Sequence, residues 1–549
     1  MELFRSFTRW TRAATTSAAA PCRSLSRTLA SPFALILLFS SAAQAQAPKP
    51  KPVPAASSLS QDRVDRGLQV ARTSPIALYA WLFKMPKGAD LHIHITGAVY
   101  AETFISEAIE DHLCVNTTAL AFTKPQSLSS TTPPEPVCAE GEVPASQALK
   151  DQALYDALVD AFSMRGFVPA SGITAHDHFF DAFDKFKEVR RAHLGDWLDE
   201  LATRAASQNE QYLELMHTPP FPHASAAAAA VPWQDDLAAL RDQLLAHGLK
   251  EDIAAITSLT DAAEKLRNTR ERCGQPDAAP ACRVQIRYLF QVLRGLPKEI
   301  VFAQTILAME TAVVDPRFVG LNFVMPEDGV TSMRDYDLQM HMLEVLHTLY
   351  PNVHIALHAG ELAPGLVPYE GLTDHIRGAV EQGHAERIGH GVDIMYETRP
   401  HELLKEMAAK HVMVEINLTS NDIILGVAGD EHPFPIYHQF HVPVALSTDD
   451  EGVSRINLTN EYVRAVLSYD LHYADLKELV RTGLEHTFLP GESLWRDPDD
   501  FRATNHACSH DTVGNTNPSK SCADFLATSE KSRQQWDLEQ RFRQFESDF

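Results

Sequence analysis

The sequence predicts an α/β fold: a (β/α)₈ TIM-type barrel with an N-terminal helical extension and a disulfide-closed loop insertion. Two observations favour this fold. Eight short apolar, β-branched runs alternate with helix-like stretches, a pattern typical of parallel sheets. Polar side chains that can bind metals follow several of these runs, at the strand ends where barrels carry their active sites. The alternation of strands and helices alone would also allow a doubly wound open sheet.

The first 45 residues resemble an export signal. They hold five Arg and a single acidic residue, then the apolar run "PFALILLFSSAAQA" with small residues at Ala43 and Ala45. This pattern predicts a signal peptide over residues 1–45 and a secreted or periplasmic protein. A membrane anchor is the alternative, although the run is shorter than the roughly 18 apolar residues of a spanning helix.

Residues 46–84 are expected to form a Pro-rich linker, "QAPKPKPVPAAS", followed by a helical extension with one helix from about Gln61 to Phe83. The barrel should occupy residues 85–487, and a C-terminal extension residues 488–549. The eight predicted strands are "ADLHIHI" at 89, "QYLELMH" at 211, "VQIRYLFQV" at 284, "FVGLNFV" at 318, "NVHIALHAGE" at 352, "ERIGHGV" at 386, "HVMVEINL" at 411 and "VPVALSTDD" at 442.

Six of the seven cysteines lie beyond the predicted signal, in three pairs that are close in sequence. In an oxidising compartment such pairs favour disulfides, although six cysteines allow 15 connectivities and free buried thiols are the alternative. The segment at about 111–147, rich in Ser, Thr and Pro, reads as a loop insertion closed by the first pair. The pairs are Cys114 with Cys138, Cys273 with Cys282, and Cys508 with Cys522.

The net charge of −24 makes the protein strongly acidic. An acidic surface argues against nucleic acid and against anionic membranes as partners. With the signal removed, the sequence therefore favours a small-molecule partner and no membrane association.

Four residues at strand ends form a candidate metal site. His92 and His94 are two residues apart, so both side chains project to the same side of a strand. His358 and Asp449 follow two later apolar runs. Three imidazoles and one carboxylate are typical of a catalytic divalent-metal site, which lowers the pKa of a bound water from 15.7 to about 7. Taken singly, each residue could equally be an ordinary polar residue of the core or surface.

Three further polar residues lie close to these ligands in sequence. Glu361 follows His358 in "HAGE" and could face a substrate, and His390 in "RIGHGVD" could accept a proton from the metal-bound water or stabilise charge developing on it. Asp450 adjoins Asp449 and should point away from the metal, towards a hydrogen-bond donor.

The ordered motifs "MPKGADLHIH", "HAGE", "RIGHGVD", "INLTSN" and "STDDEGV" resemble the adenosine deaminase family of the amidohydrolase superfamily. The resemblance covers roughly residues 85–487. It is nearest to the secreted branch related to adenosine deaminase growth factors. Members of that branch are often dimeric, so the resemblance also implies a homodimer.

The resemblance implies a zinc-dependent enzyme, with one zinc per chain. Metal-bound hydroxide would attack C6 of adenosine or 2′-deoxyadenosine and release ammonia, which leaves inosine or 2′-deoxyinosine. The implied roles are zinc binding by His92, His94, His358 and Asp449, protonation of purine N1 by Glu361, action on the hydroxide by His390, and a hydrogen bond from Asp450 to N7. The acid at N1 must stay protonated, which burial would favour.

The branch resemblance extends to Glu327, expected to contact substrate, and to "HDHFF" at 176, which is either a helix start with core aromatics or a substrate contact. The chain departs from the family at Thr96 and Met325, where relatives carry Asp and Gly, and at Asn322, where they carry Asp. The backbone N–H of Met325 could still bind purine N3, but its side chain narrows the pocket. These departures leave the exact purine open.

Three alternative functions remain open at this point. The first is deamination of another, N6-modified aminopurine, and the second is another mononuclear amidohydrolase reaction. Two-metal amidohydrolases carry a Lys at the fourth strand, but residues 318–328 contain none. The third is a secreted signalling or binding protein with a vestigial barrel, although Glu361, His390 and all four predicted ligands are present.

Overall fold

The computed structural model describes residues 56–549 except 131, 133 and 171. The predicted signal peptide and nearly all of the Pro-rich linker lie outside the described residues. Among the described helices, none has both the length and the hydrophobicity that crossing a bilayer requires.

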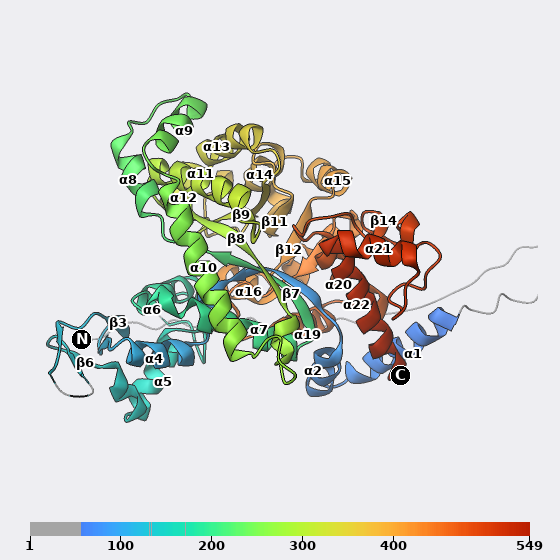
Figure 1. The fold of residues 1–549 in the computed structure, drawn as a ribbon, viewed down its shortest axis with the longest axis horizontal. Helices are drawn as coiled ribbons and strands as arrows, with labels where there is room; N and C mark the ends of the chain where they lie inside the picture. Colours follow the sequence, from blue (N-terminus) through green and yellow to red (C-terminus); the bar gives the residue numbers. More distant parts are fainter. Residues whose placement is uncertain (1–55, 131, 133, 171) are drawn as a thin grey trace, which may run out of the picture. The chain divides into compact units, whose positions relative to one another are not determined.

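All eight predicted strands are present, and they form one parallel sheet in the order β1-β7-β8-β9-β10-β11-β12-β13. Helices surround the sheet (Figure 1). The predicted barrel fold is therefore confirmed. The strands are β1 (Gly88–His94), β7 (Glu210–His217), β8 (Gln285–Leu293), β9 (Phe318–Val324), β10 (His354–Ala359), β11 (Arg387–His390), β12 (Met413–Ile416) and β13 (Val444–Leu446).

The barrel closes where the residues after β13 pair with β1. The Asp449 N–H donates to the His92 carbonyl over 2.8 Å, and the His94 N–H donates to the Asp449 carbonyl over 3.1 Å. A parallel bridge joins Ile93 and Asp449 at the same point. The first and last strands are thus neighbours, as a closed barrel requires.

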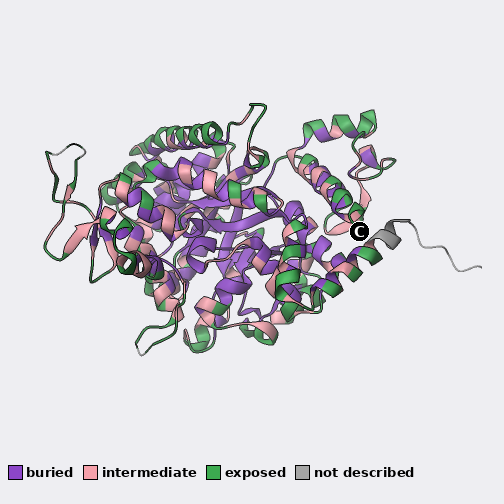
Figure 2. Ribbon diagram, turned by 90° about the horizontal axis from the view of Figure 1, so that it is seen from below, coloured by how far each residue is buried: buried purple, intermediate pink, exposed green. Residues whose placement is uncertain are grey.

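The barrel strands are almost entirely buried, with the outer helices between them and solvent (Figure 2). All residues of β1 and β7 are buried, including their polar side chains, which therefore need partners inside the protein. The helices that follow the strands are α7 (Leu194–Ser207), α8 (Pro222–Ala230), α9 (Leu237–Ala246), α10 (Glu251–Arg270), α11 (Lys298–Val314), α12 (Val330–Arg334), α13 (Tyr336–Leu349), α14 (His375–Glu381), α15 (Pro400–Lys410), α16 (Leu418–Leu425), α17 (Phe434–Gln439), α18 (Glu451–Ser454), α19 (Leu458–Ser468) and α20 (Tyr473–Glu485).

The N-terminal extension forms two helices, α1 (Ala56–Ala71) and α2 (Pro75–Lys84), where the sequence predicted one. The break lies at Ser74, whose hydroxyl accepts the Ala77 N–H, and Pro75 occupies the first turn of α2. Proline lacks an N–H and disfavours a helical residue before it, so it starts a helix more readily than it continues one.

The insertion after β1 is more ordered than the predicted loop. Helices α3 (Ile95–Ala98) and α4 (Ala101–Glu110) precede a three-stranded antiparallel sheet and a short hairpin, and α5 (Gln152–Ala161) and α6 (Ala175–Phe186) follow. The insertion is present and closed by Cys114–Cys138, but its small sheets were not predicted because strands of two or three residues leave too little periodicity to recognise. These strands are β2 (Cys114–Asn116), β3 (Ala121–Thr123) and β6 (Glu142–Pro144), and β4 (Ser127–Leu128) with β5 (Pro136–Val137).

All three predicted disulfides are present: Cys114–Cys138, Cys273–Cys282 and Cys508–Cys522. The third lies in the C-terminal extension, in a small separate core with Leu494, Trp495, Leu526 and Trp536. This extension consists of β14 (Trp495–Asp497), β15 (Asp500–Thr504), α21 (Lys520–Thr528) and α22 (Glu530–Ser547).

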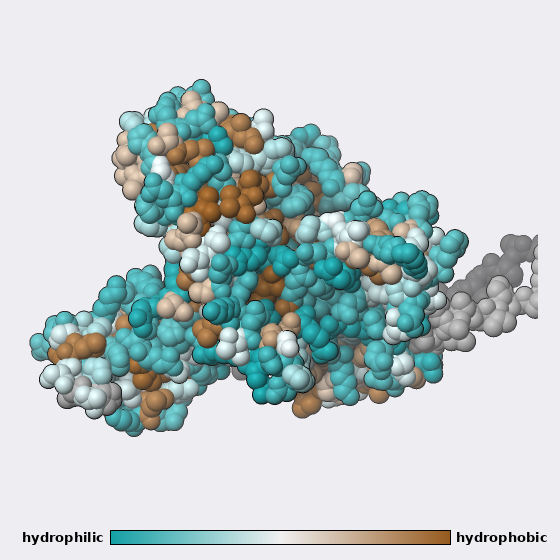
Figure 3. Space-filling model, viewed as in Figure 1, coloured by the Kyte–Doolittle hydropathy of each residue, from teal (hydrophilic) through white to brown (hydrophobic). Residues whose placement is uncertain are grey.

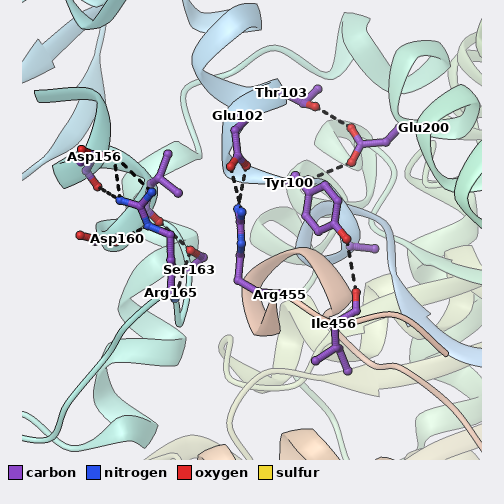
Figure 4. A network of polar contacts seen from close by, with 12 residues as sticks. Tyr100, Glu102, Thr103, Asp156, Asp160, Ser163, Arg165, Glu200, Arg455 and Ile456 are labelled. Atoms are coloured by element: carbon purple, nitrogen blue, oxygen red, sulfur yellow. Dashed lines mark hydrogen bonds and ion pairs between the residues drawn. The ribbon is translucent and has the colours of Figure 1, made fainter. Parts of the chain in front are cut away.

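Polar contacts tie the loops at the barrel's C-terminal face together (Figure 4). Arg455, just after α18, forms a bidentate ion pair with Glu102 of α4 at 2.7 and 2.9 Å. Glu200 of α7 accepts hydrogen bonds from the Tyr100 N–H and from the Thr103 hydroxyl, at 3.0 and 2.6 Å. On the face seen in Figure 3, hydrophilic residues cover most of the surface, in keeping with the high net charge.

Candidate active site

The four predicted metal ligands meet at the C-terminal end of the barrel. His92 and His94 come from β1, His358 from β10, and Asp449 from the turn that closes the barrel. The Nε2 atoms of His92 and His94 lie 3.1 and 3.3 Å from His358 Nε2. Asp449 Oδ1 lies 3.2 Å from His94 Nε2 and 3.5 Å from His92 Nε2.

These spacings fit one divalent ion. Ligands held about 2.0–2.1 Å from a tetrahedral zinc are separated from one another by about 3.3–3.4 Å. Three imidazole nitrogens and a carboxylate oxygen that converge in a buried site would otherwise leave their lone pairs unsatisfied. The donor set therefore suits a metal better than a network of hydrogen bonds among its own members.

Each histidine in the set is oriented through its other ring nitrogen. Because the partner atom is an acceptor oxygen in every case, the Nδ1 atom carries the proton and Nε2 faces the site. The three pairs are His92 with Glu415 Oε2 (2.6 Å), His358 with Asn322 Oδ1 (2.8 Å) and His94 with Gln291 Oε1 (3.4 Å). Asn322 thus orients the metal ligand His358. The predicted departure from the family at position 322 therefore concerns this metal ligand and not a substrate contact.

Glu415 belongs to a buried chain of charges that runs down the barrel interior. Its second oxygen lies 2.8 Å from Arg387 Nε, and Arg387 Nη2 lies 2.7 Å from Glu214 Oε2. All three side chains are buried. Although burial raises its pKa, the positive charge of Arg387 and the hydrogen bond from His92 hold the pKa of the Glu415 carboxyl below its usual value.

Glu361 lines the cavity beside the metal ligands, in the loop after β10. Burial raises the pKa of its carboxyl well above the usual value, and the negative charge of Asp449 adds to this effect. This shift favours the protonated carboxyl, the form that can donate a proton.

Glu327 holds the Glu361 loop in place. Its two oxygens accept the N–H groups of Gly360 and Glu361 at 3.1 and 2.8 Å, and the ring of His375 donates to it at 2.6 Å. The side chain is 1% exposed and does not line the cavity. The expectation that Glu327 contacts substrate stays a prediction; in this structure its carboxylate accepts these three hydrogen bonds.

A chain of hydrogen bonds sets the tautomer of His390. The Phe434 N–H donates to His432 Nδ1, so His432 carries its proton on Nε2 and donates it to Asn421 Oδ1. The amide of Asn421 consequently donates to His390 Nδ1 over 2.9 Å. Neutral His390 therefore holds its proton on Nε2, an atom with no hydrogen-bond partner among the described residues. Burial lowers the pKa of His390 to about 3, which keeps the ring neutral.

Asp450 points into the same cavity, next to the ligand Asp449. Burial, with the charge of Asp449, raises the pKa of Asp450 to about 8, so its carboxyl can donate a hydrogen bond near neutral pH. Its Oδ1 has no hydrogen-bond partner within the described part of the chain. It also lies so close to Gly97 that a Cβ there would be only 1.5 Å away. Glycine is thus required at position 97.

The cavity has a volume of about 320 Å³, and its upper wall is apolar. Helix α6 contributes aromatic rings, and its first turn is capped by Thr174, so the "HDHFF" stretch both starts a helix and lines the cavity. Met325 also lines it and adopts a φ of 90°, a conformation that favours glycine. The apolar lining residues are Phe179, Phe180, Phe183, Leu293, Val324, Met325, Pro326 and Ile424.

A closed (β/α)₈ barrel with this ligand set places the chain in the amidohydrolase superfamily. The family model for adenosine deaminase matches residues 170–495, more than half of the sequence. The chain belongs to the adenosine deaminase family. Its assignment to the secreted branch of that family stays a prediction.

Curated relatives match over a shorter stretch. An adenosine deaminase of Clostridium perfringens is 34% identical over 139 residues, which cover 25% of this chain and 39% of the relative. One of Clostridium acetobutylicum is 29% identical over 160 residues, covering 29% of this chain and 44% of the relative. The chain thus spans about two fifths of the length of the curated relatives that it matches.

Solved structures resemble the chain more distantly. The N6-mAMP deaminase of Arabidopsis is 19% identical with a TM-score of 0.48, covering 75% of this chain and 96% of that one. A Zn-bound amidohydrolase of Burkholderia ambifaria is 17% identical with a TM-score of 0.46, covering 75% of this chain and 88% of that one.

Proposed function

We propose that this protein is a zinc-dependent deaminase that hydrolyses adenosine and 2′-deoxyadenosine to inosine and 2′-deoxyinosine. The observation that carries the proposal is the convergence of four metal-ligand atoms, with four of their separations at 3.1–3.5 Å, in a cavity that Glu361 also lines. Membership of the adenosine deaminase family supports the same reaction.

When bound, zinc supplies a nucleophile at neutral pH by lowering the pKa of water from 15.7 to about 7. Glu361 donates its proton to purine N1, which draws electron density from C6 and favours addition of oxygen there. Asp450 donates a hydrogen bond to N7. A bond forms between C6 and the oxygen of water, and the bond between C6 and the amino nitrogen breaks. One proton of the water goes to the amino nitrogen, which leaves as ammonia, and the other returns Glu361 to its acid form.

His390 stabilises charge on the oxygen that adds at C6. With Nδ1 accepting from Asn421, its Nε2–H is available as a donor, and the ring would have to exchange tautomers to act as a base. Of the two roles that the sequence left open for His390, the geometry supports the donor. The aromatic wall from α6 shields these hydrogen bonds from water, where they would be weaker.

The test measures ammonia release from adenosine, 2′-deoxyadenosine, adenine, AMP and N6-modified purine nucleosides, with metal content determined on the same sample. We expect one zinc per chain and highest turnover on a purine nucleoside or nucleotide. A metal-free sample with full turnover, or a non-purine as best substrate, would contradict the proposal.

A Glu361→Gln variant separates proton donation from metal binding. The amide is isosteric and lies outside the ligand set, so zinc content should stay at one per chain while turnover falls to below a tenth of wild type. An active Gln variant would exclude the acid role of Glu361.

We also propose that the protein is exported and forms a homodimer. The signal-like first 45 residues and the three disulfides support export, since disulfides persist in oxidising compartments. Mass spectrometry of the mature protein should give an N-terminus near residue 46, and light scattering should give the mass of two chains. An uncleaved N-terminus or a monomer would refute the respective part.

A further inference from the structure

A second chamber opens from the catalytic cavity. It has a volume of about 410 Å³ and lies between α6, the ends of β7 and β8, and the segment before α7. The boundary between the two spaces is formed by residues that line both, namely Thr96, Phe183, Asp184, Gln291 and Leu293. The two spaces are therefore neighbours, with these five residues between them.

The proposed function places a purine in the catalytic cavity, and the position of its sugar relative to this chamber rests on that function. With N1 at Glu361 and N7 at Asp450, the five-membered ring lies on the Asp450 side. Asp450 packs against Gly97, the neighbour of Thr96, and Thr96 stands at the boundary. N9 lies across this ring from N7, and the proposal places its substituent past Thr96, where the two spaces meet.

The chamber contains a cation without a counter-ion. Arg191 donates from Nη1 to the Thr218 carbonyl but forms no ion pair with any described residue. The other cation on the wall, Lys187, is paired with Asp184 at 3.0 Å. Arg191 is exposed where it lines the chamber, and an exposed guanidinium without a counter-ion can pair bidentately with a phosphate.

His217 provides a second polar atom with no protein partner. It lines the chamber, is 6% exposed, and its Nε2 has no hydrogen-bond partner among the described residues. Arg191 is close enough to act on it electrostatically. A buried polar atom usually finds a partner, so a ligand atom is the natural one here.

We propose that the chamber binds a 5′-phosphate on the sugar of the substrate, held by the Arg191 guanidinium and by His217 Nε2, with the uncharged Thr96 at the entrance. The substrate class of this site then includes adenosine 5′-monophosphate. Deamination at C6 proceeds as for the nucleoside, and the phosphate takes no part in bond making.

The experiment compares kcat/KM for AMP and adenosine in the zinc-loaded wild type, in Arg191→Gln and in Arg190→Gln. Wild type should deaminate AMP at least as efficiently as adenosine. A charged hydrogen bond lost to phosphate should lower the AMP-to-adenosine ratio about 10- to 100-fold in Arg191→Gln. Arg190 is the matched control, because its guanidinium binds Asp111 and does not line the chamber. Its variant should keep the wild-type ratio within about twofold.

Calorimetric titration with inosine 5′-monophosphate and with inosine gives a readout that does not need turnover. Wild type should bind the monophosphate at least tenfold more tightly than inosine, and Arg191→Lys should keep more of this preference than Arg191→Gln, which separates lost charge from misfolding.

If adenosine is deaminated while AMP is inert and the monophosphate gains no affinity, the phosphate site is refuted and the deaminase stands. If no purine is deaminated but the monophosphate is preferred, the deaminase is refuted and the phosphate site stands. An equal loss of kcat/KM for AMP and for adenosine in Arg191→Gln would also overturn the phosphate site.

Discussion

Replacing Glu415 by Gln tests whether the buried charge chain supports the metal site. The carboxylate accepts the His92 Nδ1–H at 2.6 Å and pairs with Arg387 Nε at 2.8 Å. A glutamine keeps only one acceptor oxygen, so either His92 or Arg387 must face an N–H group. The substitution preserves shape and removes one negative charge from a site where neither partner contacts water.

Two magnitudes follow from this geometry. Loss of a hydrogen-bonded partner behind a metal-binding histidine typically weakens metal affinity 10- to 100-fold, or about 1.4–2.8 kcal/mol. Breaking a buried ion pair from one side typically destabilises the fold by about 3–5 kcal/mol. Because Arg387 retains Glu214 at 2.7 Å, we expect the lower end, about 3 kcal/mol.

The assays are zinc competition against a chromogenic chelator and urea unfolding of the metal-free protein. Glu386→Gln is the matched control: Glu386 precedes Arg387, is half-exposed and pairs with His354 at 2.8 Å. Its variant should change neither quantity by more than about 1 kcal/mol, the usual limit for an exposed pair. Wild-type zinc affinity in Glu415→Gln would refute the view that this chain orients the ligand.

Three further substitutions test the supporting residues. Asn421→Asp puts an acceptor opposite His390 Nδ1. The variant should have a His390 pKa above about 3 and a turnover at least tenfold lower than wild type. An unchanged pH–rate profile would contradict the tautomer assignment. Glu327→Gln should lower turnover through Glu361 with zinc content unchanged. Despite burial, the His375 hydrogen bond lowers the pKa of Glu327 to about 2, so its stabilisation is present above about pH 4.5 and lost as the pH falls towards 2. The stability difference between wild type and variant should therefore shrink over that range by about 3 kcal/mol, and a constant difference would be inconsistent with it. Met325→Gly relieves a left-handed conformation and should raise the free energy of unfolding by about 1 kcal/mol in urea titrations; a loss of stability would show that side-chain contacts outweigh the strain.

The barrel could be predicted because its signals are local. Each strand is a short apolar run, and the four ligands stand at the ends of three of them, so topology alone brings them together. The cysteine pairs were equally accessible, since each pair is close in sequence. The small sheets of the insertion were missed because strands of two or three residues show no periodicity.

The residues that support the ligands could not be assigned from sequence. Glu415 touches His92 across 323 positions, and His432 reaches His390 only through Asn421. The sequence does carry one faint signal, an acidic residue inside the apolar strand "VMVEINL", which calls for a buried partner. The sequence does not show which residue that partner is. Because it shows no long-range contacts, it also gave no sign that Glu327 accepts the N–H of Glu361.

The closure of the barrel has a mechanical consequence. The seam between β1 and the end of β13 is held by two backbone hydrogen bonds at Asp449 and by the Asp90 carboxylate, which accepts the Thr448 hydroxyl at 2.6 Å. His92 and His94 lie on one side of this seam and Asp449 on the other. A metal ion bound by all three would therefore link the two strands that close the barrel. Metal binding should therefore stabilise the pairing of these two strands. Amide hydrogens along the seam should exchange with solvent fastest in the metal-free protein.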